Sequence, residues 1–259
     1  MDLSQPKVMG ILNATPDSFF SDSRAQTERE IVLRARELVT QGAAIIDVGA
    51  CSTRPGSEAA SEAEEEQRLR MALSTIRHEL PKVVISVDTF RPNIARMAVE
   101  EFGADIINDV SGGSEEMFRL VAKMGVPYVL TSAETTLRDI LKTLAEKVQT
   151  LRDLGQKDII LDPGFGFGKT LEENYEVMRE LERLLVLELP LLVGISRKSM
   201  IYRRLGGAPA ESLNGTTILN TLSLMKGASI LRVHDVREAV ECITIVEEVK
   251  GKKGVCSSK

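Results

Sequence analysis

Polar side chains stand directly after short apolar runs at eight positions of the chain, and their types could do chemistry together. They comprise carboxylates, amides, a hydroxyl and two basic groups: Asn13, Asp47, Asp88, Asn108, Asp162, Ser196, Arg232 and His234. Any one of them could instead cap the helix that follows it, and for a single position this alternative is equally good. A set spread over seven runs is harder to explain by capping alone. Converging at one mouth, these side chains would line a ligand pocket.

The expected pocket has two chemically different sides. Carboxylates and amides would form one side, and Arg54, Lys198, Arg232 and His234 would form the other. Such a pocket suits a polar heterocycle together with an anion.

The stretch DPGFGFGKT, residues 162–170, ends in the Gly-Lys-Thr of a nucleotide-binding loop. That loop also needs a Gly separated from the Gly-Lys-Thr by four residues, and this position is Pro163, which has a fixed φ and no N–H to donate. The stretch also follows the sixth apolar run rather than the first. We therefore disfavour the P-loop and expect the three glycines to let the backbone pass beneath a ligand, with Phe165 and Phe167 facing it.

The segment GISRKSMIYRRLGG, residues 194–207, is a better anion site. A strand should end at Ser196 and a helix should begin soon after it. Backbone N–H groups, the helix dipole and the hydroxyls of Ser196 and Ser199 could then face a carboxylate or phosphate, and Lys198 adds a charge. Arg203 and Arg204 are interpreted as surface residues of that helix.

Composition excludes several classes of function. The 259 residues carry 33 Lys and Arg against 38 Asp and Glu, a net charge of -5, so no basic field is available for nucleic acid. No run approaches the roughly 18 apolar residues of a membrane span. The chain has three cysteines, which we expect to be free thiols, and two histidines, so a zinc site is disfavoured. His78 is interpreted as a structural or solvated residue. The start, MDLSQPKVMG, lacks a signal pattern, so we expect a cytoplasmic location.

The elements that position the polar residues form an internal repeat. Eight short apolar runs alternate with segments of helical periodicity, which predicts parallel strands joined by helices. Five of those helices should end in a glycine: Gly42, Gly103, Gly125, Gly155 and Gly227. Eight such units in about 250 residues predict an α/β fold, a single (β/α)₈ TIM barrel, rather than a doubly wound open sheet. We expect one domain over residues 1–250 and a disordered tail over 251–259.

Two loops are longer than a barrel requires. They run from Ala14 to about Thr27 and from Ala50 to about Ser61, after the first and second strands. Both fall on the face where barrel active sites form, so they are candidate lids. After the second loop, Ser61 and Glu64 have the spacing of a capping box, and the acidic run behind them is interpreted as a solvated helix.

With these motifs in order, the chain resembles the dihydropteroate synthase family from about residue 8 to residue 248. The stretches that carry the resemblance are MGILNATPDSF, IIDVGACSTRPG, SVDT, INDVSGG, LDPGFGFGKT, VGISRKS and ILRVHDV. The family has the barrel fold that the repeat predicts. The resemblance implies condensation of p-aminobenzoate with 6-hydroxymethyl-7,8-dihydropterin pyrophosphate, by dissociative C–O cleavage, to give 7,8-dihydropteroate and pyrophosphate.

The resemblance also implies roles for individual residues. Asp88, Asn108, Asp162 and Lys198 would bind the pterin, and Asn13 would bind the Mg²⁺ that accompanies the pyrophosphate. Thr53, Arg232 and His234 would hold pyrophosphate oxygens, while Ser199 and Ser196 would take the p-aminobenzoate carboxylate. The lid loops would supply Phe19, Phe20, Arg54 and Pro55, and Phe167 would face the substrates. Family members are usually dimers, which implies a homodimer, while the composition already predicts binding to neither nucleic acid nor membranes.

Two departures from the family keep alternatives open. The fifth apolar run continues as VLTSAETT where the family usually has Met-His-Met, and Ala50 and Cys51 replace a Gly-Glu pair. A pterin-binding barrel without synthase activity, and a pterin-dependent methyltransferase, are therefore weighed beside the synthase. The residues that bind pyrophosphate in the family are all present, which favours an active synthase.

Overall fold

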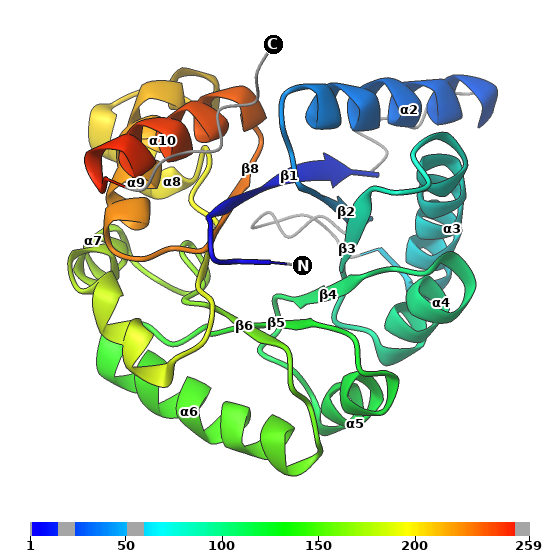
Figure 1. The fold of residues 1–259 in the computed structure, drawn as a ribbon, viewed down its shortest axis with the longest axis horizontal. Coiled ribbons are helices and arrows are strands. Elements are labelled where there is room, and N and C mark those ends of the chain that lie inside the picture. The colour runs from blue at the N-terminus through cyan, green and yellow to red at the C-terminus, as the bar shows by residue number, and fades with distance from the viewer. Residues whose placement is uncertain (1, 15–23, 51–59, 252–259) are drawn as a thin grey trace.

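A closed ring of parallel strands forms the centre of the molecule, with helices around it (Figure 1). The computed structural model describes residues 2–14, 24–50 and 60–251. The strands are β1 (Lys7–Asn13), β2 (Ile45–Gly49), β3 (Val84–Asp88), β4 (Ile106–Asp109), β5 (Tyr128–Thr131), β6 (Ile159–Asp162), β7 (Leu192–Val193) and β8 (Ile230–Val233). They pair in the order β6-β5-β4-β3-β2-β1-β8-β7, and a parallel bridge between Leu161 and Leu191 joins the two ends. The predicted (β/α)₈ barrel is confirmed.

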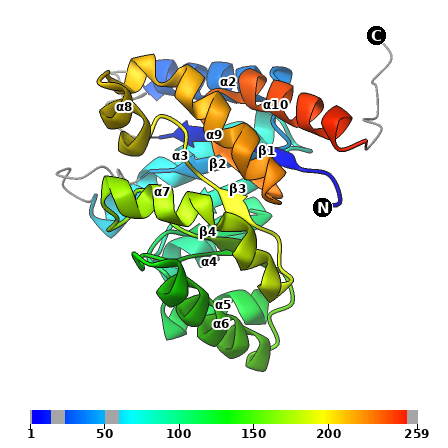
Figure 2. The ribbon, with the colours of Figure 1, turned by 90° about the vertical axis from the view of Figure 1, so that its left-hand side faces the viewer.

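The helices lie outside the strands and cover the barrel on all sides (Figures 1 and 2). They are α2 (Arg24–Thr40), α3 (Glu62–Glu79), α4 (Pro92–Phe102), α5 (Glu115–Met124), α6 (Leu137–Asp153), α7 (Leu171–Arg179), α8 (Ser199–Leu205), α9 (Leu213–Met225) and α10 (Val236–Val249), with 3₁₀ turns η1 (Leu181–Leu187) and η2 (Pro209–Glu211). None of the helices in the described ranges is both long and apolar enough to cross a bilayer.

Two apolar layers hold the barrel together. Inside it, seven strands contribute buried side chains to one cluster near their amino ends: Met9, Ile45, Ile106, Val129, Ile160, Leu192 and Ile230. Outside it, the opposite faces of the strands pack against the helices in a larger cluster. Successive side chains of a strand point to opposite faces, so continuous apolar runs fill both layers.

Local sequence signals account for the helix ends. Ser61 and Glu64 form the predicted capping box at the start of α3. Gly103 and Gly125 end α4 and α5 in the left-handed conformation, with φ of 62° and 65°. One boundary differs from the expectation: α2 begins at Arg24, so the first long loop ends before Thr27. Residues 15–23 and 51–59 of the two long loops, and residues 252–259 of the predicted tail, lie outside the described residues.

Candidate active site

The polar residues lie inside the barrel because of the two-residue period of the strands. On five strands, an inward apolar residue of the inner cluster is followed two positions later by a polar one: Asp47 after Ile45, Asn108 after Ile106, Thr131 after Val129, Asp162 after Ile160 and Arg232 after Ile230. The barrel interior therefore changes from apolar at the amino ends of the strands to polar at their carboxyl ends. This is the face on which barrel enzymes carry their active sites.

Arg232 joins two carboxylates in this polar layer. Its Nε lies 2.7 Å from Oδ2 of Asp47, and its Nη2 lies 2.6 Å from Oδ2 of Asp88. Burial alone would lower the pKa of Arg232, but the charges of Asp47 and Asp88 raise it above its ordinary value. Arg232 is therefore a permanent cation. The expectation of separate acidic and basic sides is wrong, because this guanidinium lies among the carboxylates.

Asp47 also fixes the orientation of an amide. Its Oδ2 accepts a hydrogen bond of 3.1 Å from Nδ2 of Asn108, so the amide oxygen of Asn108 is turned away from Asp47. The side chain of Asp47 is fully buried. Asp47 belongs to the polar set predicted from the sequence, but neither the motifs nor the family resemblance predict a role for it. The signal that could have found one is a carboxylate two positions after an inward Ile in a wholly buried strand.

Several buried polar atoms of the mouth have no hydrogen-bond partner in the described part of the chain. They are Oδ1 of Asp47, Oδ1 of Asn108, Oγ of Ser86 and Oγ1 of Thr131. Such atoms are costly unless a ligand or water satisfies them. Thr131 is the last residue of β5, so the fifth strand also ends in a polar residue, although the eight residues selected from the sequence include none from it.

Asp162 and Lys198 lie close enough in the mouth for the charge of each to influence the pKa of the other. The carboxylate of Asp162 accepts a 2.7 Å hydrogen bond from the backbone N–H of Gly164, and burial raises its pKa while Lys198 opposes the shift. Burial lowers the pKa of Lys198 to about 8, with Asp162 opposing. The ammonium of Lys198 donates to the carbonyl oxygen of Phe165 and lies 4.5 Å from the ring centre of Phe167.

Asp88 responds to burial in the same direction as Asp162. Burial raises its pKa to about 7, and the charge of Arg232 opposes the shift.

The loop between β6 and α7 settles how DPGFGFGKT is used. The ammonium of Lys169 lies 2.9 Å from the carbonyl oxygen of Gly164 and 3.4 Å from those of Ser132 and Phe167. It is bound to the protein's own backbone, which contradicts the P-loop alternative. Phe165 is fully buried in the outer core, so its expected exposure to a ligand is wrong, whereas Phe167 is partly exposed beside Lys198.

The loops after β7 and β8 are tied together. The hydroxyl of Ser196 accepts a 3.2 Å hydrogen bond from the backbone N–H of His234. Two further bonds, of 2.9 and 2.7 Å, join the Arg197 guanidinium to the carboxylate of Asp235. Ser199 begins α8, as predicted, and Arg203 and Arg204 are exposed. The structure therefore brings Ser196, Lys198, Ser199 and His234 to one side of the mouth.

His234 is neutral at pH 7 in the ligand-free protein. Burial, and next to it the charge of Arg232, lowers the pKa of His234 to about 4. Its expected place on a positively charged side is thus corrected: it can hydrogen-bond an anion but carries no charge before the anion arrives. The second histidine, His78, is exposed, and its Nδ1 lies 3.1 Å from Oε1 of Glu79, in agreement with its interpretation as a structural or solvated residue.

Asn13 ends β1 at the same mouth, with a partly exposed side chain. It pairs in register with Gly49 of β2, which pairs in turn with Asp88. A single amide oxygen beside an anion site suits Mg²⁺, which binds few protein oxygens and keeps water and substrate phosphates as its other ligands. Within the described residues, no cluster of three or more His, Cys, Asp or Glu could hold a metal ion without such help.

Some predicted residues fall outside the described residues. These are Thr53, Arg54, Pro55, Phe19, Phe20 and Cys51. Of the cysteines, Cys242 is a buried free thiol, as expected.

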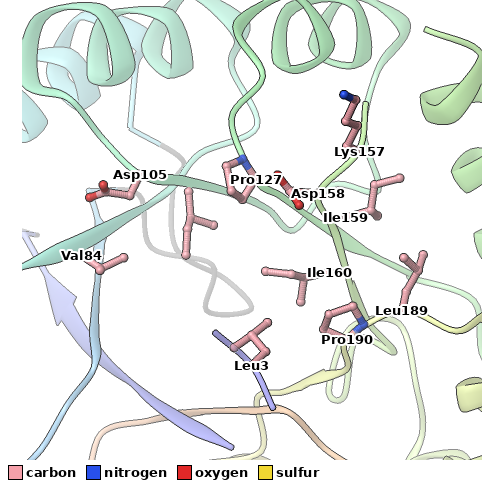
Figure 3. A pocket seen from close by; sticks show the side chains of 11 residues that line it. Leu3, Val84, Asp105, Pro127, Lys157, Asp158, Ile159, Ile160, Leu189 and Pro190 are labelled. Atoms are coloured by element: carbon pink, nitrogen blue, oxygen red, sulfur yellow. The ribbon is translucent and has the colours of Figure 1, made fainter. Parts of the chain in front are cut away.

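A separate cavity of about 380 Å³ opens at the other end of the barrel. Side chains around the amino ends of the strands line it, among them Leu3, Val84 and Ile160 (Figure 3). None of the predicted site residues lines this cavity. The polar mouth, rather than this apolar pocket, is the candidate active site.

Comparison with known proteins identifies the class to which this fold and mouth belong. A family model described as "pterin binding enzyme" matches residues 9–234, a range that includes every polar strand-end residue. The dihydropteroate synthase of Clostridium beijerinckii is 41% identical over 242 residues, which cover 89% of each chain. Hence the chain belongs to the dihydropteroate synthase family, whose members are transferases of folate biosynthesis.

Solved structures agree over nearly the whole chain. Dihydropteroate synthase from Clostridium difficile, in the presence of pteroic acid, has a TM-score of 0.90 and 33% identity, covering 95% of this chain and 97% of that one. The Xanthomonas albilineans enzyme with 4-aminobenzoic acid has a TM-score of 0.88 and 35% identity, covering 96% and 95%. The altered fifth strand and the two substitutions after β2 therefore leave the family fold intact.

Proposed function

We propose that the polar mouth binds 6-hydroxymethyl-7,8-dihydropterin pyrophosphate and transfers its pterin-methyl group to p-aminobenzoate. The observation that carries this proposal is the set of buried oxygens, beside fixed cations, that have no partner among the residues the structure describes. Oδ1 of Asn108 and the carboxyl groups of Asp88 and Asp162 offer acceptors to the N–H edges of a pterin ring. Lys198 would donate to a ring acceptor, and Phe167 beside it would pack on the substrates.

The anion would bind on the side of β8 and of the loop after β2. Nε and Nη2 of Arg232 donate to Asp47 and Asp88. Among the described residues Nη1 has no hydrogen-bond partner, so it remains available to bind an oxyanion. His234 would add a hydrogen bond, and Thr53 and Arg54 would approach from the second loop. Asn13 would hold Mg²⁺, which when bound neutralises charge on the leaving pyrophosphate.

The reaction depends more on electrostatic stabilisation of the leaving pyrophosphate than on proton transfer. The C–O bond to pyrophosphate breaks and its electron pair leaves with the pyrophosphate, while the dihydropterin ring delocalises the cation that forms. The neutral aryl amine then forms the C–N bond and releases a proton. The contribution of Arg232 and His234 is to stabilise the leaving anion in a site from which Pro55 and the other lid residues would exclude water.

The p-aminobenzoate carboxylate would lie near the loop after β7. Support comes from the hydroxyls of Ser196 and Ser199, from the first turn of α8 and from Lys198 next to it. The Xanthomonas albilineans relative with 4-aminobenzoic acid supports the choice of amine. The test is inhibition by a sulfonamide, which mimics p-aminobenzoate. We expect the sulfonamide to compete with the amine. Synthesis that continues at sulfonamide concentrations far above that of the amine would contradict this site.

We extend the proposal to a homodimer built on α9 and α10. Large apolar side chains are exposed along one stripe of each helix, Ile218, Leu222 and Met225 on α9 and Ile245 and Val249 on α10. The two helices pack side by side (Figures 1 and 2). A patch of this kind commonly marks an interface. Sedimentation should show a dimer, and the double variant Ile218→Glu, Ile245→Glu should dissociate it into monomers.

A cytoplasmic location stays a prediction, which cell fractionation would test.

A further inference from the structure

The ammonium group of Lys169 binds backbone carbonyl oxygens from two different loops. Its ammonium contacts the carbonyls of Gly164 and Phe167 in its own loop and that of Ser132 in the loop after β5. An ammonium has three N–H donors and no acceptor, so it can bond to all three oxygens at once. This side chain has no role in the proposed reaction.

The two loops that Lys169 joins are in direct backbone contact. A Cβ atom on Gly164 would lie 1.9 Å from the carbonyl oxygen of Ser132, and one on Gly168 would lie 3.2 Å from that of Ala133. Gly164 also has a φ of 69°. Carbonyl oxygens that converge in this way repel each other unless a donor lies between them. The ammonium of Lys169 is that donor.

The loop held by Lys169 controls two residues of the mouth. The N–H of Gly164 donates to the Asp162 carboxylate, and the carbonyl of Phe165 accepts from Lys198. On its far side the loop is held by Asn174, whose Oδ1 accepts a 2.7 Å bond from the N–H of Gly166. A shift of this loop would therefore move the partners of both Asp162 and Lys198.

We propose that Lys169 is a positioning residue for pterin binding, an inference that rests on the proposed function. It fixes the loop after β6 against the loop after β5 and thereby sets the geometry of Asp162 and Lys198. Burial lowers the pKa of Lys169 to about 8, with the charge of Asp162 opposing, which fits an ammonium held by backbone rather than by water. The lysine of this Gly-Lys-Thr thus binds backbone carbonyl oxygens and not a phosphate.

The test is Lys169→Met, which keeps most of the side-chain volume and removes the donors. We expect the KM for dihydropterin pyrophosphate to rise about tenfold or more, while the KM for p-aminobenzoate at saturating pterin changes by less than about twofold. Lys169→Arg keeps a cation with several donors and should recover part of the loss. Lys226→Met is the matched control, because it also removes a lysine bound to a backbone carbonyl, that of Arg179, but away from the mouth.

A merely structural role would lower the melting temperature of Lys169→Met and leave its KM values unchanged. That result, or a Lys169→Met protein that does not fold, would overturn the proposal. Calorimetric titration of dihydropterin pyrophosphate without amine separates this inference from the proposed function. If the wild type binds the pterin but makes no product, the proposed function is contradicted. The Kd for the pterin still tests the role of Lys169, because we expect it to be roughly tenfold higher in Lys169→Met than in the wild type.

Discussion

Asp47 and Arg232 meet inside the barrel, with Oδ2 of the carboxylate 2.7 Å from Nε of the guanidinium. They come from β2 and β8, which lie on either side of β1. The same Oδ2 accepts from Asn108, so one carboxylate orients a residue proposed for the pyrophosphate and a residue proposed for the pterin. Asp47 thus couples the two halves of the substrate site.

The first prediction concerns that carboxylate. Asp47→Asn removes the charge paired with Arg232, and its amide oxygen keeps only the weaker neutral acceptor for the bonds from Arg232 and Asn108. We expect kcat/KM to fall at least about tenfold. Steady-state kinetics on folded protein measures it, with Asp105→Asn as the control. Asp105 also accepts two hydrogen bonds through Oδ2, from Arg77 and from the N–H of Ile85, but at the opposite end of the barrel, so this variant should keep its activity.

The second prediction concerns the charged pair of the pterin site. Asp162→Ala and Lys198→Ala should each lower turnover at least about 100-fold, because each removes a charged group from a desolvated site. Near-normal turnover in either variant would refute the assignment. Lys157→Ala serves as the control, since Lys157 is exposed beside the cavity at the other end of the barrel (Figure 3).

How far could the sequence predict this site? The position of polar residues after short apolar runs was sufficient to place Asp88, Asn108, Asp162 and Arg232 in the barrel at the carboxyl side of their strands, because successive parallel strands end on the same face. The pairing of Arg232 with Asp47 could not be predicted, since it depends on the register of β8 against β1 and of β1 against β2.

The orientation of the loop residues also escaped prediction. Phe165 and Phe167 are two residues apart and each has a glycine on both sides, yet one is buried in the core and the other lies beside Lys198. Positive φ angles at Gly164, Gly166 and Gly168 set this difference, and a pattern of glycines does not reveal which angles they adopt.

The third prediction uses the histidine of the site. The pKa of His234 is lowered to about 4 in the folded protein, mainly by burial, whereas an unfolded histidine titrates near 6.5. Between these values the unfolded chain binds the extra proton, so the free energy of unfolding decreases as the pH falls. From pH 7 to pH 5 this group should remove about 2 kcal/mol.

The difference between wild type and His234→Gln in urea denaturation at both pH values isolates that contribution, because the raised pKa values of the buried Asp88 and Asp162 act on both proteins in the opposite direction. His234→Gln should show a smaller loss than wild type, because it lacks the titrating group. His78→Gln removes the exposed histidine and should behave like wild type. Equal losses in the two variants would show that His234 is not the group responsible.

The fourth prediction tests the close contact of the loops after β5 and β6. Gly164→Ala combines a φ of 69° with a Cβ that would overlap the carbonyl oxygen of Ser132. We expect it to lower the free energy of unfolding by at least about 3 kcal/mol. Gly103→Ala has a similar φ of 62° but an open surrounding, so it should cost only about 1 kcal/mol. Chemical denaturation of both variants gives the difference, and similar costs would mean that the loop moves apart freely.

Pyrophosphate release tests the account most directly. Purified protein is given dihydropterin pyrophosphate and Mg²⁺, with and without p-aminobenzoate, and both pyrophosphate and dihydropteroate are measured. We predict release that depends on the amine and matches the dihydropteroate formed. Pterin binding without release would contradict the account and make the chain a pterin-binding barrel without synthase activity.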